Sequence, residues 1–107
     1  MDKKEIINQY KNRKQTGGVF AIKNTLSGKW YVDSAPDTEA AKNRFEFMGD
    51  SFIKIANDYK SQKGEGFVFE VLDELQKGDS QTDKEFQDDL SMLKSIWLEK
   101  LSGQPLY

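Results

Sequence analysis

The sequence predicts a small α/β domain of the α+β type, in which helices flank a three-stranded antiparallel sheet. Its 107 residues fit one compact domain, because single domains typically span about 50–250 residues. Three short runs are rich in β-formers, and the residues between and after them carry apolar side chains at helical spacing. The predicted order of elements is therefore helix, two strands, two helices, strand and helix.

A first helix is expected over residues 1–15, because Ile6, Ile7 and Tyr10 form one apolar stripe there. Gly17-Gly18 ends it, so we divide the chain into a helical arm at 1–16 and a main domain at 17–107. The arm carries five basic and two acidic residues, which favours a solvent-facing helix over a small phosphate-binding patch. The basic residues are Lys3, Lys4, Lys11, Arg13 and Lys14.

The first two strands are expected to form an antiparallel β-hairpin. Val19–Ile22 and Trp30–Val32 are rich in β-formers, and a polar segment that contains Gly28 separates them. A third strand is predicted over Phe67–Leu72, and its apolar character favours a position away from a fully exposed edge.

Three further helices complete the predicted domain. Pro36-Asp37 begins the second helix with Asp37 as N-cap, and the last helix is expected over residues 83–101. Gly49-Asp50-Ser51 separates the second helix from the third. The expected buried faces are Ala41, Phe45 and Met48 in the second, Phe52, Ile55, Ala56 and Tyr59 in the third, and Phe86, Leu90, Leu93, Trp97 and Leu101 in the last.

The composition excludes several kinds of chemistry. The chain has no Cys and no His, which removes thiol nucleophiles, zinc ribbons, iron–sulfur sites and every Ser–His or Cys–His pair. The net charge of −2 argues against strong nonspecific nucleic-acid binding as the default. We expect a cytoplasmic protein without a membrane partner, since the sequence has no signal peptide and no apolar run of the roughly 18–20 residues that span a bilayer.

Residues 18–35, GVFAIKNTLSGKWYVDSA, resemble the signature of the GIY-YIG nuclease superfamily. The motif aromatics Phe20 and Tyr31 lie eleven residues apart, as in intron-homing members. Two helices, a strand and a helix that carries Trp97 then follow in the order of the family, so the resemblance covers residues 17–101. It implies a GIY-YIG endonuclease-like fold, and the chemistry of that family is Mg²⁺-dependent hydrolysis of phosphodiesters.

The resemblance also assigns four central roles, and this chain keeps one of the residues. The first motif Tyr is Phe20, which has no hydroxyl group to move a proton, whereas the second motif Tyr is retained as Tyr31. The phosphate-binding Arg of the family falls on Ala41, and its metal-binding Glu falls on Lys94. A lysine at that position repels Mg²⁺, so we interpret the active site as degenerate.

Asp33 replaces the Gly that closes the family's motif. We predict that Asp33 and Lys94 both face the former active site and lie within hydrogen-bond distance, with the ammonium in the place of the metal. No metal and no cofactor is expected. The residues predicted to line the former active-site cleft are Phe20, Tyr31, Asp33, Ala41 and Lys94.

The sequence leaves two classes of function open. The favoured one is a non-catalytic binding or interaction module, which binds nucleic acid weakly or contacts a protein partner or a second copy of the chain. The alternative is an active Mg²⁺-dependent DNA endonuclease that uses Tyr31, Arg44 and a displaced carboxylate such as Glu99. Arg44 follows Ala41 by nearly one helical turn, although a solvated or loosely ion-paired arginine is the simpler interpretation.

Overall fold

The computed structural model describes residues 16–107. The predicted helical arm and its five basic residues lie outside the described residues, except Thr16, which begins the first strand. The elements are β1 (Thr16–Asn24), β2 (Trp30–Ala35), α2 (Thr38–Met48), the 3₁₀ turn η1 (Gly49–Ser51), α3 (Ala56–Ser61), β3 (Phe67–Gln76) and α4 (Asp83–Lys100).

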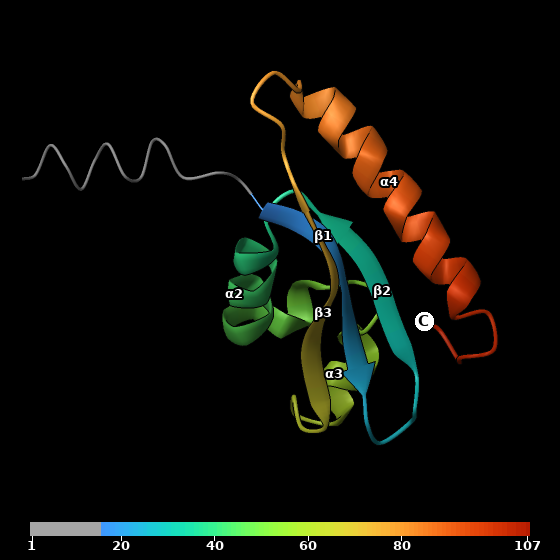
Figure 1. Ribbon diagram of the computed structural model, residues 1–107. Coiled ribbons are helices and arrows are strands. Elements are labelled where there is room, and N and C mark those ends of the chain that lie inside the picture. Colours follow the sequence, from blue (N-terminus) through green and yellow to red (C-terminus); the bar gives the residue numbers. More distant parts are fainter. Residues whose placement is uncertain (1–15) are drawn as a thin grey trace, which may run out of the picture.

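The three strands form one antiparallel sheet in the order β2-β1-β3, with helices beside it (Figure 1). This confirms the predicted α+β class and the predicted hairpin, in which Phe20 pairs with Asp33 and Ile22 with Tyr31. Strand β1 is central and is buried from Gly17 to Ile22, because it has a strand on each side and helices over both faces.

Strand β3 lies at an edge of the sheet, but this edge is not fully exposed, as its apolar sequence predicts. It also continues to Gln76 rather than ending at Leu72. An edge strand can be apolar here because helices cover both faces of the sheet: Phe69 packs against one core and Leu72 against the other. The apolar sequence therefore reflects burial of the two faces and not a central position.

Alternate residues of β1 supply the two cores, since successive side chains of a strand point to opposite faces. Phe20 and Ile22 pack with residues of the α2, η1 and α3 layer, and Val19 and Ala21 face α4. Figure 1 shows α4 along one face of the sheet and the shorter helices on the other. This arrangement places the end of β2 between α2 and α4.

Helix α2 begins as predicted: the side chain of Asp37 accepts hydrogen bonds from the backbone N–H groups of Glu39 and Ala40, at 3.0 and 3.1 Å. Ala41 and Phe45 pack against the core. Met48 is 56% exposed, so its predicted burial is wrong. The reason is that the chain leaves the helical path at Met48 to form η1.

The third helix is shorter than predicted and begins at Ala56. Phe52 and Ile55 are buried as expected, but they lie on tight turns. The backbone N–H of Ile55 donates to the carbonyl of Phe52, a three-residue spacing in place of the α-helical four. Among residues 16–107, no helix has the length and apolar character to cross a bilayer.

Candidate functional site

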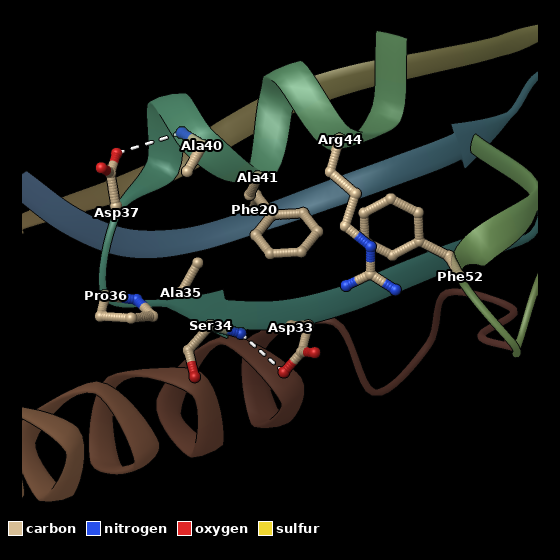
Figure 2. Close-up of a pocket in the computed structure, with 10 residues that line it drawn as sticks. All are labelled: Phe20, Asp33, Ser34, Ala35, Pro36, Asp37, Ala40, Ala41, Arg44 and Phe52. Carbon is tan, nitrogen blue, oxygen red and sulfur yellow. Dashed lines mark hydrogen bonds between the residues drawn. The ribbon is translucent and has the colours of Figure 1, made fainter. Parts of the chain in front are cut away.

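A pocket of about 320 Å³ opens between the end of β2 and helix α2 (Figure 2). Three of the five predicted cleft residues, Phe20, Asp33 and Ala41, line it together with Arg44. Tyr31 and Lys94 adjoin the pocket through Asp33. The full lining consists of Phe20, Asp33, Ser34, Ala35, Pro36, Asp37, Ala40, Ala41, Arg44 and Phe52.

Phe20, at the first motif position, is a core residue as well as a wall of the pocket. It is 2% exposed, and its ring stacks on Phe69 with the ring centres 5.1 Å apart. The edges of Phe52 and Tyr31 approach the same ring, at 6.2 and 6.3 Å between centres. Such aromatic contacts stabilise the fold, and none of them requires a hydroxyl group at this position.

Asp33 is the polar centre of the site, and both of its carboxylate oxygens are engaged. The ammonium of Lys94 lies 3.2 Å from Oδ1, which confirms the predicted contact between the two residues. The backbone N–H of Ser34 also donates to Oδ1, at 2.8 Å, and the hydroxyl of Tyr31 donates to Oδ2, at 2.8 Å. The ion pair joins β2 to α4.

The hydroxyl group of Tyr31 is held in its protonated form. Its pKa is raised to about 12, chiefly by burial and further by the hydrogen bond to Asp33 and the negative charge of that carboxylate. The positive charge of Arg44 acts in the opposite direction. A general base is most effective when its pKa lies near the working pH, so Tyr31 is poorly suited to accept a proton.

Replacement of Asp33 by Asn is expected to lower the pKa of Tyr31. The variant removes the negative charge, but burial persists, so we expect the pKa to fall below 12 and to stay above the ordinary 10. The measurement is the alkaline absorbance titration of the phenolate, taken as the difference from the same titration in a Tyr31→Phe background. Asp37→Asn is the control, because this carboxylate lines the pocket and caps α2 instead. An unchanged titration in Asp33→Asn would show that Asp33 does not hold this proton.

Arg44 reaches the pocket from α2 and is fixed by contacts with the following turn. Its Nε donates to Oγ of Ser51 and its Nη2 donates to the carbonyl of Ser51, both at 2.8 Å. The guanidinium carbon lies 4.1 Å from the centre of the Phe52 ring. In Figure 2 the guanidinium extends from α2 toward the β2 side of the pocket, where Asp33 lies. The site therefore contains one arginine in a defined orientation.

The pocket does not offer the ligands that Mg²⁺ requires, which are oxygen atoms, mainly of carboxylates. Asp33 is already paired with Lys94, and Glu99 is exposed on α4. Within residues 16–107, no group of three or more Asp or Glu side chains is placed to hold a metal ion.

The fold and the site define a class, an α+β domain in which an apolar pocket at the end of β2 adjoins the polar cluster of Tyr31, Asp33 and Lys94. No family model matches the chain, and no curated protein matches it. Two solved structures do, both of the catalytic domain of the homing endonuclease I-TevI. A mutant form gives a TM-score of 0.58 at 27% identity, over 81% of this chain and 84% of that chain. The other gives a TM-score of 0.56 at 28% identity, over 80% of this chain and 88% of that chain. The chain therefore has the GIY-YIG-like fold.

Sequence reasoning missed the residues that orient Arg44. Ser51 was expected only to break a helix, and Phe52 only to fill the core, yet both hold the guanidinium. No local signal marks them, because the contact forms when η1 folds back against α2. Asn24 was also overlooked as a buried polar centre, although it lies within residues 18–35, which carry the resemblance.

Proposed function

We propose that this chain is a non-catalytic module of GIY-YIG-like fold that binds nucleic acid weakly. The observation that carries the proposal is the ion pair between Lys94 and Asp33. Lys94 stands where the resemblance expects a metal-binding Glu, and its ammonium repels a divalent cation. The pairing also occupies the nearest carboxylate. We therefore propose that the domain works without a metal or another cofactor.

The other three positions of the former active site support the same proposal. Phe20 has no hydroxyl group, and Ala41 has no charge to stabilise a phosphate. The hydroxyl of Tyr31 donates a hydrogen bond to Asp33, and its pKa is raised. Hydrolysis of a phosphodiester needs charge stabilisation where charge develops, and these side chains supply none.

Nucleic acid is the favoured partner because the similar solved structures are of a homing endonuclease domain and because Arg44 lies in the pocket. The interaction is expected to be weak. Tight binding to a duplex depends on many Lys and Arg contacts to phosphates, and the net charge of this chain is −2. A protein partner or a second copy of the chain is the alternative, and a cytoplasmic location remains a prediction.

The proposal is tested by incubating the purified protein with single-stranded and double-stranded DNA in the presence of Mg²⁺ or Mn²⁺. We expect salt-sensitive binding and no cleavage. Cleavage that Tyr31→Phe abolishes, and that the control Tyr59→Phe retains, would contradict the proposal and favour the endonuclease that uses Tyr31, Arg44 and Glu99. Absence of both binding and cleavage would contradict the nucleic-acid part and indicate a protein partner.

A further inference from the structure

The size and walls of the pocket limit what it can bind. At about 320 Å³ it lies near the lower end of the roughly 300–1,000 Å³ typical of ligand pockets, so it fits a single ring system. Six of its ten lining residues are apolar, and three of those are alanines that leave the space open. The apolar residues are Phe20, Ala35, Pro36, Ala40, Ala41 and Phe52.

Arg44 gives this apolar pocket a directional pair of donors. A guanidinium group has five N–H donors in a rigid planar fork. Ser51 uses two of them, through Nε and Nη2, while the ring of Phe52 supports one face of the group. Nη1 has no hydrogen-bond partner within residues 16–107, so its N–H groups and the second N–H of Nη2 are available to a ligand.

The charges around the pocket disfavour an anion as the main ligand. Asp33 and Asp37 line it against the single cation of Arg44, and Lys94 balances only Asp33. A phosphate bound against the apolar walls would lose hydration and gain little attraction. A flat, neutral ring with two neighbouring acceptor atoms can pack against the apolar walls and accept hydrogen bonds from Arg44.

We propose that this pocket binds one unpaired guanine base, with its O6 and N7 atoms on the free N–H groups of Arg44 and its ring against the apolar wall. Arginine bound to O6 and N7 is the commonest specific contact between a side chain and guanine. Adenine presents N7 beside an amino donor, which would meet a donor of Arg44. The base comes from a free guanine nucleotide or from an unpaired position in a strand, and the inference rests on the proposed function.

The first test is titration of the protein with GMP, AMP and inorganic phosphate. Calorimetry measures the affinity, and the NMR chemical shifts of the pocket alanines report where the ligand binds. We expect GMP to bind at least about tenfold more tightly than AMP, and inorganic phosphate not to compete. Equal affinity for GMP and AMP, or displacement of GMP by phosphate alone, would overturn the proposal.

Two variants test the site itself. Arg44→Gln is expected to weaken GMP binding about tenfold by removing the forked donor. Ala40→Leu should weaken it similarly by filling the pocket, and Ala40 is exposed, so the fold tolerates the larger side chain. Lys42→Gln is the control, because it makes the same change in charge on an exposed part of α2 outside the pocket. Wild-type affinity in either pocket variant would overturn the proposal.

An oligothymidylate with one central guanine distinguishes the two sources of the base. Binding that depends on this guanine in the single strand, and is lost in a duplex, assigns the pocket to a strand, and binding of GMP alone assigns it to the free nucleotide. DNA binding that Arg44→Gln leaves unchanged would overturn the guanine pocket and leave the proposed function standing. Mg²⁺-dependent cleavage would overturn the proposed function and leave the pocket to be judged by its affinity for GMP.

Discussion

Gly18→Ala is expected to lower the free energy of unfolding by about 3 kcal/mol or more. A Cβ atom at this position would lie 2.0 Å from the carbonyl oxygen of Asp73, and 3.0 Å from its carbonyl carbon and from Cα of Glu74. All three atoms belong to the backbone of β3, so relief requires the strands to separate. The register between β1 and β3 shifts at Val19/Phe20, directly beside this contact.

Urea unfolding of Gly18→Ala, Gly28→Ala and Gly103→Ala tests this prediction. Gly103 faces open space, so its variant should unfold near the wild-type midpoint. Gly28 also has open space but has a φ of +79°, and an alanine in that region costs about 1–2 kcal/mol. A Gly18→Ala midpoint that equals the Gly103→Ala midpoint would contradict the close approach of the two strands.

The result bears on the motif, because Gly18 is its first residue. The close packing of β1 on β3 requires a glycine here whether or not the site hydrolyses a phosphodiester. A retained glycine is therefore evidence for the fold, and the chemistry has to be judged from the side chains around Asp33.

Asn24→Leu is expected to lower the free energy of unfolding by about 3 kcal/mol, because it removes the centre of a buried polar network. Asn24 is fully buried at the end of β1. Its Nδ2 donates to Oε1 of Gln62 at 2.6 Å and to the hydroxyl of Tyr107 at 2.8 Å. Its Oδ1 accepts from Nε2 of Gln62 at 3.0 Å and from the backbone N–H of Leu26 at 3.1 Å. The network ties the hairpin turn to α3 and to the C-terminal residues.

Urea unfolding again gives the measurement, with Asn43→Leu as the control because Asn43 is exposed on α2. A double-mutant cycle with Tyr107→Phe separates the hydrogen bond between Asn24 and Tyr107 from the change in packing. We expect the two substitutions to be non-additive, since both remove the same contact. If Asn24→Leu lowered the free energy of unfolding no more than Asn43→Leu does, the result would contradict a stabilising network around Asn24.

Local sequence signals predicted the elements whose formation depends on neighbouring residues. Asp37 caps α2 as expected, and α4 runs from Asp83 to Lys100, within one residue of the prediction. The exposure of Met48 was predicted incorrectly, and the sequence did not indicate that β3 lies at an edge of the sheet. Both depend on what packs against the segment, and residue spacing along the chain carries no information about that.

The sequence by itself determined which side chains are present for chemistry. It lacks His, and it has Phe20, Asp33, Ala41 and Lys94 at four positions that the resemblance assigns to the active site. The residue types are read directly from the sequence, whereas the expected contact of Lys94 with Asp33 also needed the resemblance, which places both residues at one site.

Only the tertiary structure decided how the remaining side chains are used. The hydroxyl of Tyr31 donates a hydrogen bond to Asp33, and Arg44 is held by Ser51 and Phe52 at the edge of an apolar pocket. The physical reason is that backbone propensity and periodicity are local, whereas a hydrogen bond across elements depends on sheet order, on the path of η1 and on which groups share a buried space. The direction in which a hydroxyl or a guanidinium points follows from that packing.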